Sequence, residues 1–134
     1  MIIPTLSLMK YLSQNGFGTM SKDLFWEKLE LSANGVYIVS NGQAQELHTR
    51  RVQSFTLYSR GDNDISGYTK LESIVEFLNS SESVCTLPSV RDKATNTVAD
   101  AIENVFIQPL TTITNSGKDS EGKTIWIATG QIVY

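Results

Sequence analysis

The feature that most constrains this fold is a change in the spacing of apolar residues near the middle of the chain. In TRRVQSFTLYSR, neighbouring side chains alternate across a strand, with Phe55 and Leu57 on one face and Val52, Thr56 and Tyr58 on the other. Apolar residues then recur about every 3.6 positions, as on one face of a helix: Tyr68, Leu71, Ile74 or Val75, and Leu78. The sequence therefore predicts a strand that leads directly into a helix packed against the sheet.

The joint between the two patterns is YSRGDND, residues 58–64, which contains an Arg-Gly-Asp tripeptide. That tripeptide serves cell adhesion on exposed loops of secreted proteins, and no pattern in this sequence indicates secretion. We expect a structural joint instead. Arg60 is then the solvated end of the strand, and Gly61 is the flexible residue at which the chain turns. Asp62 or Asp64 caps the helix, because a carboxylate accepts hydrogen bonds from its first N–H groups.

The same residues offer an alternative of a different class, a small calcium- or ligand-binding module. An EF-hand loop needs oxygen ligands at its first, third and fifth positions, glycine at the sixth and glutamate at the twelfth. The stretch DNDISGYTKLES meets the first half with Asp62, Asp64, Ser66 and Gly67. Its twelfth residue is Ser73, however, and Glu72 lies about 100° away around a helix. The helix-joint interpretation is therefore favoured over calcium.

In the first half of the chain, Leu6, Met9 and Leu12 follow Pro4 at helical spacing, which predicts a helix over residues 4–15 with Gly16 as its C-terminal cap. The stretch DLFWEKLEL, with apolar residues at 24, 26, 29 and 31, predicts a short edge strand or an irregular arm. GVYIVSNG, between Gly35 and Gly42, predicts a buried strand.

The second half is rich in strand patterns. VCTLPSV predicts a short strand or turn, and residues 91–100 fit either a loop or a helical turn. SGKDSEG joins two long runs, IENVFIQPLTTITN and KTIWIATGQIVY, into a hairpin. The last run is apolar on both faces, because Trp126 alternates with Ile125 and Ile127, so helices or a neighbouring subunit must cover it. We expect one α+β domain over residues 1–134, with a mostly antiparallel sheet, two main helices packed on one face and a C-terminal β-hairpin.

Composition fits a globular domain of 134 residues, with 40% hydrophobic and 19% charged residues. The net charge of -3, with no Lys/Arg cluster larger than Arg50 and Arg51, argues against specific nucleic-acid binding. No apolar run approaches the ~18 residues of a membrane span, and we expect a soluble protein that is not exported. The single cysteine, Cys85, excludes an internal disulfide and a thiolate zinc cluster, and we expect it to be a small buried residue.

No residue pattern indicates catalysis. The one histidine, His48, stands beside two arginines without a serine or cysteine nucleophile signature, and we interpret it as a polar residue of a loop or of the start of a strand. P-loop, dinucleotide-binding, zinc and HExxH patterns do not occur. The sequence supports neither an enzyme nor a cofactor or metal site.

The order of these elements resembles the tail terminator proteins of long-tailed bacteriophages, which are often labelled minor tail or minor capsid proteins. The resemblance rests on the N-terminal helix, GVYIVSNG, the strand RRVQSFTLYSRG leading directly into GYTKLESIVEFL, and the closing hairpin from residue 105 to residue 134. It covers most of the chain.

The resemblance implies a structural protein of the virion, made in the host cytoplasm and located where tail meets neck. Such proteins form a ring, typically a homo-hexamer, that caps the head-proximal end of the tail tube, ends its polymerisation and meets the head connector, while DNA passes through the lumen without specific binding. The ring needs two different complementary patches on each subunit. Candidate docking residues are Arg50 and Arg51, after the loop Asn41–Thr49, and Lys118, Asp119 and Glu121 in the hairpin loop. Another neck protein, such as a head-completion or connector protein, is the nearest alternative.

Overall fold

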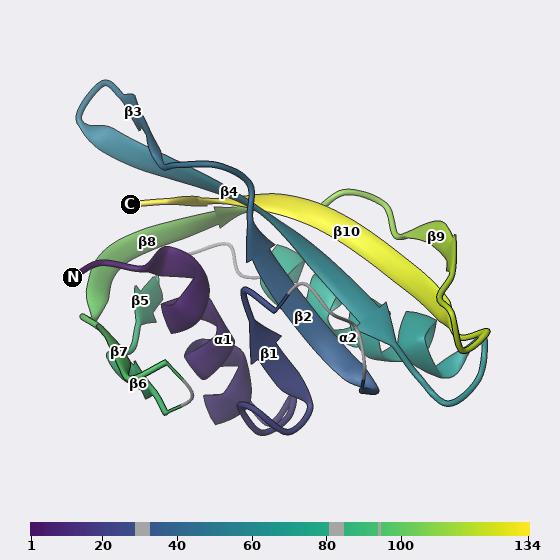
Figure 1. The fold of residues 1–134 in the computed structure, drawn as a ribbon. Coiled ribbons are helices and arrows are strands. Elements are labelled where there is room, and N and C mark those ends of the chain that lie inside the picture. The colour runs from purple at the N-terminus through teal and green to yellow at the C-terminus, as the bar shows by residue number, and fades with distance from the viewer. Residues whose placement is uncertain (29–32, 81–84, 94) are drawn as a thin grey trace.

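The computed structural model describes residues 1–28, 33–80, 85–93 and 95–134 (Figure 1). In this part of the chain the elements follow one another as α1 (Pro4–Gln14), β1 (Leu24–Trp26), β2 (Gly35–Ser40), β3 (Gln45–Leu47), β4 (Arg50–Arg60), α2 (Ser66–Ser80), β5 (Cys85–Leu87), β6 (Val90–Asp92), β7 (Thr97–Ala99), β8 (Ile102–Gln108), β9 (Thr114–Lys118) and β10 (Thr124–Val133). No described helix has the length and apolar character that a membrane crossing requires.

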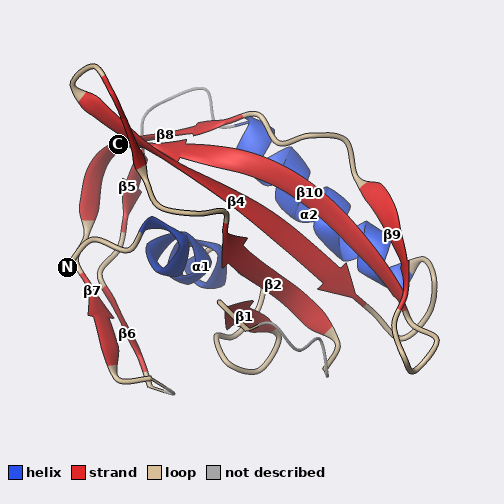
Figure 2. Cartoon of the chain, turned by 45° about the horizontal axis from the view of Figure 1, so that its top comes forward, coloured by secondary structure: helices blue, strands red, loops and turns tan. Residues whose placement is uncertain are grey.

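Eight of these strands form one curled sheet (Figure 2). Its main order is β1-β2-β4-β10-β8-β5, while β3 pairs with β4 and β9 pairs with β10. The pair β1 and β2 is parallel, and the other pairs are antiparallel. The remaining strands, β6 and β7, form a separate antiparallel pair. The predicted α+β class, with its mostly antiparallel sheet and C-terminal hairpin, is confirmed.

The two long strands β4 and β10 run through the centre of the sheet, paired from Arg60 opposite Ile125 to Val52 opposite Val133. Phe55 and Leu57 are fully buried on one face, as their alternation predicted. Side chains from both helices join them in one core cluster: Leu8, Met9 and Leu12 from α1, and Leu71, Ile74 and Leu78 from α2. The expectation of two helices on one face is thus confirmed, because their apolar stripes have the same sheet surface to bury.

Only one face of β10 is covered by the helices. Trp126 lies on that face, where its ring contacts Tyr68 of α2 edge-on at a centroid distance of 5.1 Å. Ile127 points to the opposite face, beside Tyr58 of β4, and both side chains are half-buried. The apolar residues on the two faces of β10 therefore have different surroundings. Trp126 packs against a helix, whereas Ile127 packs beside Tyr58 of the neighbouring strand.

Helix α1 begins and ends at the signals that the sequence predicted. Pro4 occupies the first turn, where a missing N–H has no intrahelical partner to lose. At the other end Gly16 adopts a φ of 85°, and the N–H groups of Gly16 and Phe17 donate to the carbonyls of Ser13 and Leu12. This pair of bonds is a Schellman motif, which favours glycine because the left-handed backbone crowds a Cβ atom.

Several expectations needed the structure to settle or correct them. The stretch after residue 22 contains an edge strand, β1, whereas Leu29 and Leu31 lie outside the described residues. Within residues 91–100, Arg91 and Asp92 belong to β6 and Thr97–Ala99 form β7, so the expectation of a loop or a helical turn is wrong for these residues. Pro109 separates β8 from β9, so IENVFIQPLTTITN is two strands rather than one. The segment Asn41–Thr49 is not simply a loop, because it contains β3.

Candidate subunit interfaces

Arg60, the last residue of β4, is buried rather than solvated, so the expectation of an exposed strand end is wrong. Its side chain is 3% exposed, and its Nε atom lies 3.0 Å from Asp119 Oδ2. Its Nη2 atom donates to Glu121 Oε2. The turn between β9 and β10 brings both carboxylates to the guanidinium, and their negative charges offset the cost of removing it from water.

The turn that carries Asp119 is itself tightly bonded. Asp119 Oδ1 accepts hydrogen bonds from the main-chain N–H groups of Lys123 at 2.9 Å and Glu121 at 3.0 Å. These bonds, above all the one from Lys123, lower the pKa of Asp119, and the charge of Arg60 acts in the same direction. Asp119 and Glu121 therefore already have an internal role, while Lys118, at the end of β9, is exposed.

Gly61 serves close packing, and the expectation that it supplies flexibility is wrong. A Cβ atom at this position would lie 2.0 Å from Ser66 Oγ and 2.6 Å from the main-chain nitrogen of Gly67. The first turn of α2 thus approaches the backbone at the end of β4 more closely than any side chain permits. Gly67 on the helix side completes this approach, since its own Cβ would lie 3.2 Å from the nitrogen of Gly61.

The cap of α2 is Asn63, not Asp62 or Asp64 as the sequence suggested. Asn63 Oδ1 accepts hydrogen bonds from the N–H groups of Ile65 at 3.0 Å and Ser66 at 2.9 Å. Asp64 Oδ1 instead accepts from Thr124 Oγ1 at 2.7 Å, and Asp62 Oδ1 accepts from Asn34 Nδ2. Asp64 thus connects the joint to β10, and Asp62 connects it to the residue before β2, which sequence spacing alone does not reveal.

This arrangement gives the calcium hypothesis no support. Asp62 and Asp64 bond to side chains of different segments, and Ser66 Oγ accepts from the N–H of Asn63 at 3.2 Å. Among the residues that the structure describes, no group of three or more His, Cys, Asp or Glu side chains is placed to hold a metal ion.

At the opposite end of β4, the hairpin of β3 and β4 projects beyond the body of the protein as an arm (Figure 1). The base of the arm is fixed, because the main chains of Arg51 and Tyr134 exchange two hydrogen bonds of 2.7 and 2.9 Å. Arg50 donates a hydrogen bond to the carbonyl of Asn104, and Arg51 lies 3.6 Å from Glu46. Both predicted docking arginines are exposed.

An open groove of about 420 Å³ lies at the base of this arm. It is lined by side chains from the N-terminal segment, the arm and the last strand: Ile2, Glu46, His48, Arg50, Arg51 and Tyr134. His48 is exposed in the turn between β3 and β4, which agrees with the first of its two interpretations, a polar residue of a loop. The structure therefore places Arg50 and Arg51 in the lining of this groove, at the opposite end of β4 from the joint at residues 58–64.

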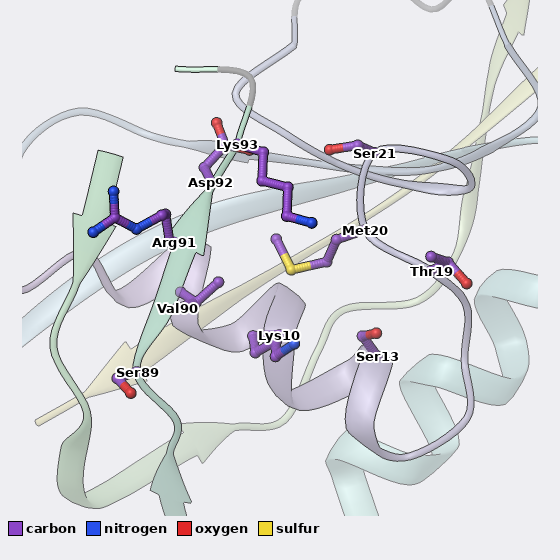
Figure 3. Close-up of a pocket in the computed structure, with 10 residues that line it drawn as sticks. All are labelled: Lys10, Ser13, Thr19, Met20, Ser21, Ser89, Val90, Arg91, Asp92 and Lys93. Atoms are coloured by element: carbon purple, nitrogen blue, oxygen red, sulfur yellow. The ribbon is translucent and has the colours of Figure 1, made fainter. Parts of the chain in front are cut away.

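A second pocket, of about 430 Å³, lies between α1 and the hairpin of β6 and β7 (Figure 3). Lys10 of α1 and Lys93, next to β6, line it together with Ser13, Met20 and Ser21. The sequence showed no basic cluster beyond Arg50 and Arg51, because Lys10 and Lys93 are far apart in the chain. Only the packing of α1 against β6 brings them together.

Cys85 at the start of β5 is half-buried against the main core rather than fully buried. Burial raises the pKa of its thiol, because the charged thiolate is poorly solvated there. A raised pKa is the opposite of what a nucleophilic cysteine needs, so the position is that of a packing residue.

No protein-family model matches this chain, and no curated protein matches it.

Proposed function

We propose that this protein is a tail terminator of a long-tailed bacteriophage, a structural protein that forms a ring on the head-proximal end of the tail tube. The ring, a homo-hexamer, ends tube polymerisation and forms the joint to the head connector. The observation that carries the proposal is that β4 bears two unlike surfaces at its opposite ends. A basic groove with a projecting arm lies at Arg50, and an acidic joint with a second hairpin lies at Arg60.

Two unlike surfaces on one rigid element suit a ring. A ring repeats one head-to-tail contact until rotation closes it, so each subunit must carry both halves of that contact on different sides. Between the two ends run β4 and β10, paired over nine residue pairs and covered on one face by both helices. Such a sheet holds the two surfaces at a fixed separation, and a fixed separation is what a closed ring requires.

The strand β9 is the element that we assign to docking on the tail tube or the head connector. Thr114 to Lys118 are all exposed, and β9 is bonded to β10 along one edge. The other edge offers main-chain N–H and C=O groups to which a partner strand can add. The net charge of -3 fits a ring through which DNA moves without adhering.

Electron microscopy of the purified protein tests the proposal, first alone and then mixed with tail tubes assembled from the tube protein of the same virus. We expect closed rings, or caps at one end of each tube, and tubes that no longer elongate when more tube protein is added. A Lys118→Glu variant serves as the docking probe: it should form rings as the wild type does and cap tubes less well. Tubes that elongate normally in excess protein would exclude a terminator. Binding to head connectors without tube capping would identify another neck protein.

A further inference from the structure

Ile65 is an apolar side chain displayed on the surface, with 67% of its area exposed. It directly precedes α2 and follows Asp62 and Asp64. Its main chain is held in place, because its N–H donates to Asn63 Oδ1 and its carbonyl accepts from the N–H of Thr69 at 2.9 Å. Because its backbone is already fixed, Ile65 would lose little conformational entropy on binding. That property favours a role as the anchor of an interface.

The groove at the other end of β4 has matching chemistry. Ile2, 50% exposed, and the half-buried Tyr134 supply apolar surface, and Arg50 and Arg51 supply positive charge. Its volume of about 420 Å³ exceeds what one isoleucine side chain fills, so flanking residues can enter with it. Glu46 lies on the same rim, where it neutralises part of the charge of Arg51.

The charges at the two ends are also complementary. Asp62 and Asp64 accept hydrogen bonds from neutral side chains, Asn34 and Thr124. The ammonium of Lys123 contacts this segment, but it donates at 3.0 Å to the main-chain oxygen of Asp62, so neither carboxylate forms a described ion pair. The nearest arginine in sequence, Arg60, is already paired with Asp119 and Glu121. At the groove, the described hydrogen bond of Arg50 goes to a neutral carbonyl oxygen. We call Asp62, Asp64 and Ile65 the knob. The knob is acidic and apolar and lies near one end of β4, and the basic, apolar groove lies at the other end.

We propose that Ile65 of one copy inserts into the groove of the next copy, with Asp62 and Asp64 against Arg50 and Arg51. Ten residue steps of β4 separate the two halves, or about 33 Å at roughly 3.3 Å per residue. One copy therefore carries the knob and the groove on opposite sides, and the contact is head-to-tail. The contact between two copies does not depend on the proposed function. The further step, closure of the repeated contact into a ring on a tail tube, rests on the proposed function.

Two single-sided variants test the contact by sedimentation velocity and light scattering. Ile65→Glu removes the knob, and Arg50→Glu with Arg51→Glu reverses the groove. We expect each variant to weaken self-association at least about tenfold, since a charge buried in an apolar contact is strongly unfavourable. Mixed in equal amounts, the two variants should form a dimer and nothing larger, because each pair has one intact knob and one intact groove. Val98→Glu, which alters another exposed apolar residue on β7, is the matched control and should assemble as the wild type does.

Disulfide trapping reports the same contact when the wild type is monomeric at low concentration. In a Cys85→Ala background, Ile65→Cys with Thr49→Cys places one thiol on the knob and one at the rim of the groove. Oxidation should give a ladder of covalent oligomers, and either cysteine alone should give at most dimers.

The outcomes separate this inference from the proposed function. Three results would overturn the contact: Ile65→Glu assembles as well as the wild type, the mixed variants form no dimer, or oxidation of the double-cysteine protein gives no ladder. None of these results bears on tube capping, so the proposed function would stand. Rings built through this contact that never cap tail tubes would overturn the terminator proposal and leave the contact standing.

Discussion

Arg60 Nε lies 3.0 Å from Asp119 Oδ2, and this pair joins the end of β4 to the turn between β9 and β10. The guanidinium is almost fully buried, with 3% of its side chain exposed, whereas the second carboxylate, that of Glu121, is 62% exposed. The two carboxylates are therefore unequal partners. Asp119 fixes the position of the turn, and Glu121 adds a contact that water weakens.

Replacing Arg60 by methionine should lower the free energy of unfolding by about 1–3 kcal/mol, because Asp119 and Glu121 lose the buried guanidinium with which they form ion pairs. Urea denaturation at neutral pH measures this loss. Glu121→Gln is the matched control and should cost less than about 1 kcal/mol, as exposed ion pairs do. Equal losses in the two variants would contradict the unequal roles assigned to the carboxylates.

Stability should fall in acid through Asp119. The main-chain N–H of Lys123, with that of Glu121 and the charge of Arg60, lowers the folded-state pKa of Asp119 below its ordinary value of 3.8. The unfolded chain therefore binds a proton more readily than the folded one, so this contribution is complete above the unfolded pKa and disappears as pH falls through the folded pKa. The difference in urea midpoint between wild type and Asp119→Asn should be larger at pH 7 than at pH 3. A difference that does not change with pH would contradict this assignment.

Gly61→Ala should lower stability by about 1–3 kcal/mol, because the new methyl group overlaps the first turn of α2. Thermal and urea denaturation measure the effect. Adding Ser66→Ala should recover only part of the loss, since the nitrogen of Gly67 would still lie 2.6 Å from the methyl carbon. Full recovery in the double variant would show that Ser66 Oγ alone makes the contact close.

Asn63→Ala should lower stability by about 0.5–2 kcal/mol, as expected for the loss of an N-terminal cap. Asn63→Asp should retain most of that stability, because a carboxylate oxygen accepts the same two N–H groups. Melting temperatures of the two variants, measured beside Asp62→Ala, give the comparison. A larger loss in Asp62→Ala than in Asn63→Ala would restore Asp62 as the cap.

The local pattern of the sequence determined much of the architecture. Alternation in residues 52–58 and a period near 3.6 from residue 68 predicted β4 and α2 in their observed order, because side-chain direction in strands and helices depends on backbone geometry alone. Pro4 and Gly16 predicted the ends of α1 for the same reason. Proline lacks an N–H and glycine adopts a left-handed backbone, and both properties belong to the residue itself. The fold class follows from these elements and from the apolar stripes that they must bury together.

Only the tertiary structure decided which polar residues meet. The sequence predicted Asp62 or Asp64 as the cap of α2, whereas Asn63 accepts the helix N–H groups. The two aspartates instead bond to Asn34, just before β2, and to Thr124 of β10. Arg60 is buried because a turn far along the chain brings carboxylates to it. The groove at Arg50 and the exposed position of Ile65 likewise depend on packing between distant segments. Contacts of this kind are set by the three-dimensional path of the chain, and the spacing of residues along it carries no record of them.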